Sequence, residues 1–216
     1  MNQIKEDLIA SNEFIPFLSF NKEMFGRIFF DDQFKSLILT GQQSSDLIKV
    51  CEFNPKTRYK LLYRASEHGF RANDFHSKCD GHANTLTIFQ ASETSFVFGA
   101  FTSAIWESSQ PGKYKPDSNA FVFSLTNKDN KPCKMNIDPN KHQNAIYCYY
   151  GCGPIFGSGH DIYIAPNANT NTSCLSNFSS TYKHPLFEYG SLEAQSYLAG
   201  TYKFQVSEIE IYEIEN

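Results

Sequence analysis

Two histidines and a cysteine lie at intervals of three residues in one stretch of the chain, at His76, Cys79 and His82. Imidazole nitrogen and thiolate sulfur are ligands that zinc prefers, and on a helix His76 and Cys79 share a face. A tetrahedral zinc site wants a fourth ligand, and the chain has only this one close group. The alternative is a buried Cys79 thiol beside two surface or helix-capping histidines. We expect that alternative, with no metal and no cofactor, and retain the three residues as metal-ligand candidates.

The segment 148–152 (CYYGC) places two cysteines, Cys148 and Cys152, in a C-x3-C spacing that differs from the C-x-x-C of thioredoxin-like sites. On a strand both thiols would face one side, roughly 13 Å apart, and a turn at 151–154 would shorten that distance. The functional interpretation is a peroxide-sensitive thiol pair, which needs exposure and a lowered pKa. No Lys, Arg or His adjoins either cysteine, so the alternative of two inert thiols stays open.

Cys174 is the third redox candidate, and with His160 and Asp161 it has the residue types of a nucleophilic site. The adjacency of His160 and Asp161 does not support such a site, because neighbours on a strand face opposite ways. The chain also lacks the G-x-S-x-G elbow of serine hydrolases. We therefore expect no catalytic residues and no enzyme.

The C-terminal segment concentrates acidic residues within an alternating apolar pattern that predicts a strand. Like charges so close together repel, so the pattern needs an explanation. One explanation is an edge strand whose charges prevent aggregation. The other is a docking surface for a basic partner, with Glu208, Glu210 and Glu213 as candidate binding residues and Glu215 beside them.

The composition excludes several classes of function. The chain has 216 residues, 41% of them hydrophobic and 15% aromatic, enough for a sizeable core in one domain. Its formal net charge of −4 argues against nucleic acid and against a polybasic membrane anchor. No apolar run approaches the ~20 residues of a membrane-spanning helix, and the N-terminus lacks the apolar stretch of a secretory signal. We therefore expect a cytoplasmic protein without a transmembrane segment, whose six cysteines are thiols.

Short apolar runs separated by turn residues predict the fold. Strands are expected at 36–40, 59–65, 85–90, 95–101, 120–126, 133–137, 146–150, 161–165 and 202–214, and short helices at 44–51 and 73–79. This is an all-β-dominated α+β pattern, and it predicts a two-sheet antiparallel β-sandwich with a few short peripheral helices.

Three finer expectations concern the ends of the chain and its core. Residues 1–34 are expected to form an aromatic-rich helical or irregular extension, and 35–216 the domain. The apolar positions of the last strand change parity, so bulges are expected near Ser207 and Tyr212. Trp106, the single tryptophan, is expected to be at least half buried.

The order of these segments resembles the TLDc domain, the module of oxidation-resistance proteins and some TBC-containing proteins. The resemblance spans about residues 35–215. It is carried by 61–70 (LLYRASEHGF), 85–88 (TLTI), 97–103 (VFGAFTS) with Trp106, 120–125 (AFVFSL), 156–164 (FGSGHDIYI), Cys174 and 204–214. Three features depart from the animal pattern: Pro154 and Ile155 replace part of a glycine run, the block 73–81 is richer, and the insertion 179–200 is longer.

The resemblance implies a function as well as a fold. It implies a non-catalytic interaction module that protects against oxidative stress or binds and regulates the vacuolar proton pump. The expected partner is thus a protein, in particular a subunit of that pump, with the chain a monomer held at endolysosomal membranes through its partner. The alternative is a thiol- or metal-dependent antioxidant enzyme, which peroxide consumption by cysteine variants would distinguish.

Overall fold

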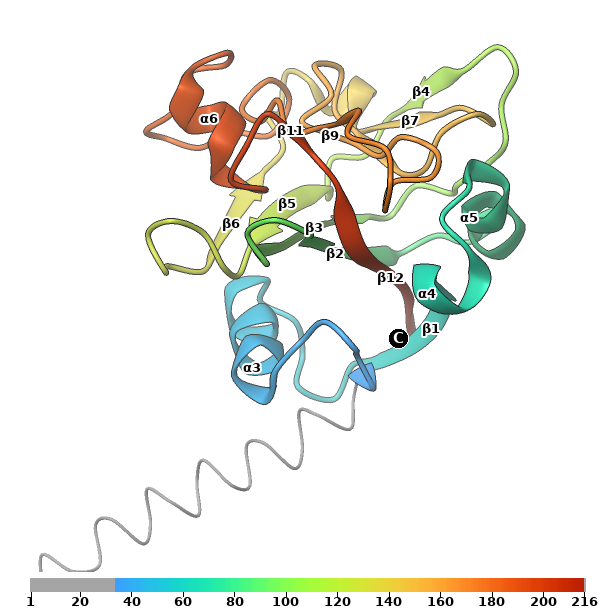
Figure 1. Ribbon diagram of the computed structural model, residues 1–216, viewed down its shortest axis with the longest axis horizontal. Helices are drawn as coiled ribbons and strands as arrows, with labels where there is room; N and C mark the ends of the chain where they lie inside the picture. The colour runs from blue at the N-terminus through green and yellow to red at the C-terminus, as the bar shows by residue number, and fades with distance from the viewer. Residues whose placement is uncertain (1–33, 216) are drawn as a thin grey trace, which may run out of the picture.

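A computed structural model describes residues 34–215. These residues form two antiparallel sheets of six strands each, with a few short helices (Figure 1). The predicted β-dominated sandwich with few short helices is therefore confirmed. The expected extension at 1–34 lies, apart from Phe34, outside the described residues.

Sheet A contains the longer strands, and its order is β1-β12-β2-β3-β5-β6. All of its neighbouring strands are antiparallel. The bounds are β1 Arg58–Arg64, β2 Thr85–Ala91, β3 Val97–Thr102, β5 Phe121–Ser124, β6 Cys133–Asn136 and β12 Val206–Glu215.

Sheet B is built from much shorter strands, in the order β11-β10-β9-β8-β7-β4. Strands of two or three residues carry little period-2 signal, which is why three of them were not predicted: β4, β8 and β10. The bounds are β4 Lys113–Lys115, β7 Ile146–Cys148, β8 Ile155–Phe156, β9 Ile162–Tyr163, β10 Cys174–Leu175 and β11 Lys203–Phe204.

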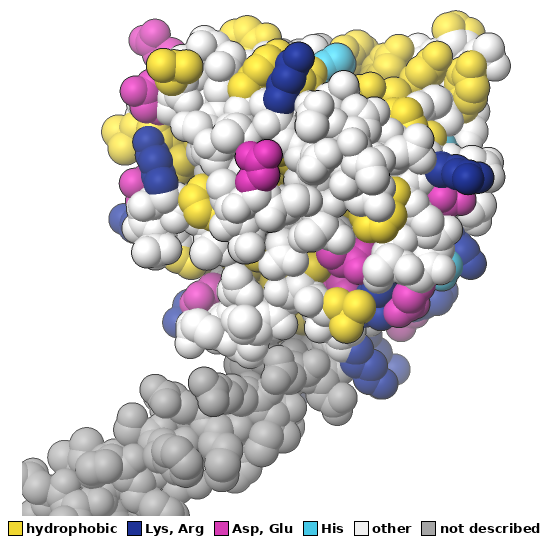
Figure 2. Space-filling model, viewed as in Figure 1, with side chains coloured by type: hydrophobic (Ala, Val, Ile, Leu, Met, Phe, Trp, Pro, Cys, Tyr) yellow, Lys and Arg dark blue, Asp and Glu magenta, His cyan; other side chains and the backbone are white. Residues whose placement is uncertain are grey.

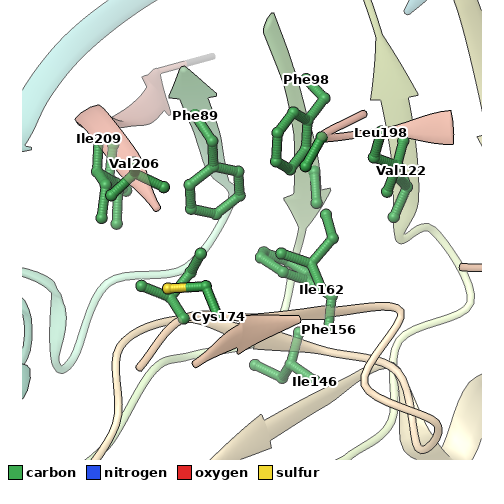
Figure 3. Close-up of a cluster of buried hydrophobic side chains, with 14 of the residues drawn as sticks. Phe89, Phe98, Val122, Ile146, Phe156, Ile162, Cys174, Leu198, Val206 and Ile209 are labelled. Carbon is green, nitrogen blue, oxygen red and sulfur yellow. The ribbon is translucent and has the colours of Figure 1, made fainter. Parts of the chain in front are cut away.

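The main core lies between the two sheets (Figure 3). Trp106 closes one end of this core: it is 1% exposed and meets Phe75 and Phe156 edge-on, with ring centroids 5.3 and 5.6 Å away. Its indole N–H donates to Thr85 Oγ1 at 2.8 Å, so its polar atom is satisfied inside the protein. The expected burial of Trp106 is confirmed. Figure 3 labels Phe89, Phe98, Val122, Leu198, Val206, Ile209, Ile146, Phe156, Ile162 and Cys174 in this core.

A second hydrophobic cluster covers the other face of sheet A. Helix α3 (Gly41–Val50) and the segment 34–39 supply one side of it, and sheet residues such as Leu86 and Tyr212 supply the other. Sheet A is therefore buried on both faces, and nearly every residue of β2 and β3 is buried, polar ones such as Thr85 and Thr87 included.

Helix α3 begins earlier than the sequence predicted. A strand was expected at 36–40 and a helix from Ser44, but the helix starts at Gly41, after a capping box. Gln43 N–H donates to Thr40 Oγ1 at 3.2 Å, and Thr40 N–H donates to Gln43 Oε1 at 2.9 Å. Two otherwise unpaired donors are thus satisfied, and Thr40 begins a helix instead of ending a strand.

The part of the chain that the structure describes has three further short helices, which are peripheral, and the predicted 73–79 helix is confirmed as α5. Within residues 34–215, no helix is long and apolar enough to cross a bilayer. The bounds are α4 Ala65–His68, α5 Ala72–Cys79 and α6 Leu192–Tyr197, with a 3-10 turn η1 at His142–Asn144.

The last strand is not an edge strand, and that expectation was wrong. Strand β12 pairs with β1 on one side and β2 on the other, in the interior of sheet A. Its register against β2 shifts between Val206 and Glu208, which confirms the bulge predicted at Ser207. The second irregularity lies on β1 between Leu61 and Tyr63, opposite Tyr212 instead of within β12.

Two of the acidic residues of β12, Glu208 and Glu210, are correspondingly buried. The Glu210 side chain is 0% exposed, and its Oε1 accepts from Arg64 Nε at 2.9 Å and from Leu37 N–H at 2.8 Å. Its Oε2 accepts from the hydroxyls of Tyr212 and Ser36. The carboxylate therefore joins β12 to β1 and to the segment that precedes α3.

Replacing Trp106 by alanine should lower the free energy of unfolding by ~3–5 kcal/mol, because a fully buried indole leaves a cavity. Urea denaturation measures the change. The neighbouring Ile105 is 50% exposed, so Ile105→Ala should stay within about 0.5 kcal/mol of the parent. A loss below ~1 kcal/mol for Trp106→Ala would contradict its position in the core.

Replacing Glu210 by glutamine should lower the free energy of unfolding by ~3–5 kcal/mol, because it removes the buried charge that pairs with Arg64 Nε, and Glu67, the other charge partner of Arg64, is half-exposed. The side-chain amide introduced by the substitution would also point its N–H groups at N–H and O–H groups that now donate to the carboxylate. Glu213→Gln is the matched control on the same strand: its partners are half-exposed, so the loss should stay under about 1 kcal/mol. Equal losses of unfolding free energy for the two variants would show that the buried Arg64–Glu210 pair stabilises the fold no more than the partly exposed pairs of Glu213.

Candidate functional site

The structure brings one metal candidate, His76, against the turn that contains one thiol candidate, Cys152, between β7 and β8. Helix α5 lies against this turn through His76, which is 6% exposed. His76 Nε2 lies 3.0 Å from the Tyr149 carbonyl oxygen and 3.2 Å from that of Cys152. One imidazole thus contacts the carbonyl oxygens of Tyr149 and Cys152, and the second of these residues is the second cysteine of the C-x3-C motif.

The other ring nitrogen of His76 anchors the imidazole to its own helix. Nδ1 lies 2.8 Å from Asp80 Oδ1, and Asp80 Oδ2 accepts from the Ser108 hydroxyl at 2.6 Å. All the neighbours of the His76 ring nitrogens are oxygens that accept hydrogen bonds, so each nitrogen donates when it carries a proton. His76 is therefore engaged as a clamp and has no nitrogen free for a metal.

The remaining metal candidates are engaged separately. Cys79 is fully buried in the main core, and His82 Nδ1 lies 2.8 Å from Glu213 Oε1. Over residues 34–215, no group of three or more His, Cys, Asp or Glu side chains is arranged to hold a metal ion. The structure does not bring His76, Cys79 and His82 together as ligands.

The three redox candidates are free thiols in buried surroundings. Cys148 is 1% exposed, Cys152 is 8% exposed and Cys174 is 0% exposed. Cys152 lies in the predicted turn, where its N–H donates to Tyr149 O and its Sγ lies 3.3 Å from the Tyr163 hydroxyl. Figure 3 shows Cys174 pointing into the core between the sheets.

Burial works against thiolate formation at all three positions. It raises the pKa of Cys148 and of Cys174 to about 11. It also raises the pKa of Cys152, and the hydrogen bond with Tyr163 offsets only part of this rise. A peroxide-sensitive thiol needs a lowered pKa, so the local chemistry does not favour a redox role, which stays a prediction.

Only one of the three candidate binding glutamates reaches the surface appreciably. Glu208 is 7% exposed, and its carboxylate accepts from the Ser66 N–H at 3.0 Å, which ties β12 to α4. Glu210 is the buried partner of Arg64. Glu213 is partly exposed and pairs with His82 and, at 3.4 Å, with Lys60. The three glutamates therefore do not form one acidic surface, because Glu208 and Glu210 are buried on an interior strand, and a binding role for them stays a prediction.

Asp161 has a structural role that sequence analysis did not identify. Its carboxylate is fully buried and accepts from the backbone N–H groups of Ser180, Thr181 and Tyr182. Burial raises its pKa to about 6, although these hydrogen bonds act to lower it. Gly157 has φ 81°, and a Cβ there would lie 2.0 Å from Asp161 Oδ2, so the glycine admits the carboxylate. Asp161 thereby fixes the start of the 179–200 insertion to β9.

The comparison with protein families fits this architecture. A family model, described as TLDc domain, matches residues 33–215. The chain belongs to the TLDc domain family. The match identifies an oxidation-resistance-related domain and covers all of the described strands and helices. No curated protein matches the chain.

Within this TLDc domain, the segments that carried the resemblance meet at the sheets. The run 61–70 forms the end of β1 and helix α4, and 156–164 runs from β8 through β9. The contact between His76 and Cys152 had no sequence signal, because the two residues lie 76 positions apart and belong to different motifs.

The native thiols should react slowly with a disulfide reagent at about pH 8. A rise in pKa from the usual 9.0 to about 11 lowers the thiolate fraction of Cys148 and Cys174 about 100-fold. Higher intrinsic nucleophilicity offsets part of this, so we expect rates more than about tenfold below those in the urea-unfolded chain. Mass spectrometry of the labelled peptides measures each rate.

Cys133 is the internal control for this experiment, because it is the least buried of the six cysteines and should be labelled first. Native Cys148 or Cys152 reacting as fast as in the unfolded chain would contradict the inert environment and support the redox pair.

Proposed function

We propose that this TLDc domain is a non-catalytic, monomeric protein-interaction module that protects against oxidative stress, binds and regulates the vacuolar proton pump, or does both. The observation that carries the proposal is the TLDc match over residues 33–215. The family resemblance implies both the stress role and the pump as partner. In this proposal the protein is cytoplasmic and reaches endolysosomal membranes through its partner.

The chemistry of the candidate site supports a module over an antioxidant enzyme. A thiol enzyme needs a reactive thiolate, whereas burial raises the pKa of each of the six cysteines. His76, Asp161 and Glu210 are of residue types that often act in catalysis. Here each of them instead binds backbone groups or neighbouring strands. Such residues stabilise a scaffold, and the scaffold presents its surface to a partner.

Part of the contact surface is proposed to lie around Glu213, the most exposed of the three glutamates. The carboxylate faces His82 and Lys60, and these pairs hold the pKa of Glu213 below its usual range. It is therefore ionised at neutral pH and can attract a basic helix of the partner. A charge at the rim of an interface acts mainly on the association rate.

Two assays on the purified protein test the proposal. Hydrogen peroxide should be consumed no faster by the folded protein than by the unfolded chain with the same thiols, and Cys148→Ser, Cys152→Ser and Cys174→Ser should each leave that rate unchanged. Catalytic turnover that one of these substitutions abolishes would overturn the proposal in favour of the antioxidant enzyme.

The second assay uses purified vacuolar proton pump. The domain should bind the pump and change its ATPase rate, and Glu213→Lys should slow association at low salt by about threefold or more. Glu193→Lys is the matched control, because Glu193 lies on α6 at the far end of the molecule from the C-terminus (Figure 1). Absence of binding would contradict the pump as partner, and equal effects of the two variants would move the contact away from Glu213.

A further inference from the structure

The insertion at 179–200 carries a small hydrophobic surface that no other described part of the chain covers. We call its three side chains the apolar tip: Leu186, Tyr189 and Leu192. They are 80%, 53% and 79% exposed. Of the eight large hydrophobic side chains that are exposed within residues 34–215, these three fall in one stretch of seven positions. Figure 2 shows hydrophobic side chains beside acidic ones at the upper left, where α6 lies in Figure 1.

The apolar tip projects from the domain instead of lining a recess. Two successive turns, at 184–187 and 188–191, form it, and a backbone hydrogen bond closes each. Gly190 lies in the second turn with φ 83°, and a Cβ there would meet no atom of a non-adjacent residue within 4 Å. Open space around Gly190 and the exposure of Leu186 and Leu192 on either side of it show that the tip is convex.

Contacts with the rest of the domain fix the base of the tip. The Ser179 hydroxyl donates to the Phe187 carbonyl oxygen at 2.8 Å, and the ring centroids of Phe187 and Tyr197 lie 4.8 Å apart. The Asn177 amide donates to the Tyr189 hydroxyl at 2.9 Å, so the Tyr189 ring is held at its polar end while about half of the side chain stays exposed. A tip fixed in this way loses little entropy when it binds.

The outer part of the tip is acidic. Glu188 and Glu193 are exposed, and the segment 184–193 contains no lysine or arginine. Burial lowers the pKa of His184, so its imidazole adds no charge at neutral pH. Two lysines, Lys128 and Lys183, contact the base of the tip instead. The outer part therefore attracts a cationic group and repels an anionic surface.

The size and shape of the tip distinguish between the partners that could cover it. A stable protein interface takes about 800 Å² and roughly 20–30 residues from each partner. Three side chains on a convex turn fall well short of that area, and a convex surface offers no groove for a helix. The interface of a lipid bilayer accepts single projecting side chains, because lipid molecules rearrange around them, and tyrosine is enriched at that depth.

We propose that the apolar tip inserts into the interface of a zwitterionic phosphatidylcholine bilayer. Leu186 and Leu192 reach the boundary of the acyl chains. The outermost charged group of phosphatidylcholine is a quaternary ammonium, which complements the carboxylates of Glu188 and Glu193 and the aromatic ring of Tyr189. The inference goes beyond the proposed function, because it adds a direct membrane contact that does not depend on the pump.

The first test measures binding of the whole chain to phosphatidylcholine vesicles by co-flotation. A single myristoyl chain binds a bilayer with ~10⁴ M⁻¹, and the smaller apolar surface of the tip should bind about tenfold more weakly, with half of the protein bound near ~1 mM lipid. Leu186→Ser and Leu192→Ser should each weaken binding about fivefold or more, because each removes an inserted side chain.

Leu37→Ser is the matched control and should leave vesicle binding unchanged. Leu37 is 67% exposed and precedes α3, which lies across the molecule from α6 (Figure 1). Leu186→Trp gives an independent readout, because the native Trp106 is buried and its emission stays constant. Emission of Leu186→Trp should shift to the blue when vesicles are added, and that of Leu37→Trp should not. Replacing a third of the lipid by phosphatidylserine should leave binding equal or weaken it.

Four results would overturn the inference. The chain does not bind phosphatidylcholine vesicles; Leu37→Ser weakens binding as much as Leu186→Ser; or phosphatidylserine strengthens binding severalfold, which places the contact on a basic surface elsewhere. The fourth is a dimer in sedimentation that Leu186→Ser dissociates, because a second copy then covers the tip. The peroxide assay and the assay with purified pump contain no such vesicles, so failure of this inference is separable from failure of the proposed function.

Discussion

The structure depends on a carboxylate that has been buried in the middle of a sheet. Glu210 has no exposed side-chain surface, and removing such a charge from water costs several kcal/mol unless donors surround it. Its donors come from three parts of the chain: Arg64 on β1, the segment before α3, and Tyr212 on β12 itself. These parts cannot move independently, because loss of any one donor leaves the buried carboxylate with one hydrogen bond fewer. Two positions earlier, Glu208 binds the first turn of α4, so the two carboxylates hold both sides of the β1–α4 junction.

The range over which each contact acts explains which sequence predictions were confirmed. Strands of four or more residues in sheet A were found because their apolar runs are long and bounded by turn residues. The two-residue strands of sheet B are defined by hydrogen bonds to their neighbours, which sequence alone does not contain. Glutamate alternating with isoleucine is typical of a half-exposed strand, so β12 was expected at an edge. The partners of Glu210, Arg64 and Ser36, lie 146 and 174 positions away along the chain. No local sequence pattern could have predicted that they contact it.

The candidate site illustrates a similar division between local and distant information. The turn at Cys152 and the helix containing His76 were both predicted from nearby residues. That His76 binds the carbonyl oxygens of Tyr149 and Cys152 follows only from the packing of α5 against the end of sheet B. The sequence grouped His76 with Cys79 and His82 as ligands, but residue type could not show that Asp80 and Glu213 already bind the two histidines. Residue types with catalytic potential are equally able to brace a fold, and the contacts decide between the two.

The distribution of polar contacts also indicates where recognition takes place. Histidine and carboxylate side chains inside this domain are used to bind main chain: His76 two carbonyl oxygens, Asp161 three consecutive N–H groups, and Glu210 the N–H of Leu37. A group engaged in this way cannot change partners during a reaction without loosening the fold, which disfavours catalysis at these positions. Each contact instead rigidifies a loop that reaches the surface. In the insertion 179–200, Asp161 fixes the start of the segment from which Leu186 and Tyr189 project, and a surface held in this way loses little entropy when it binds.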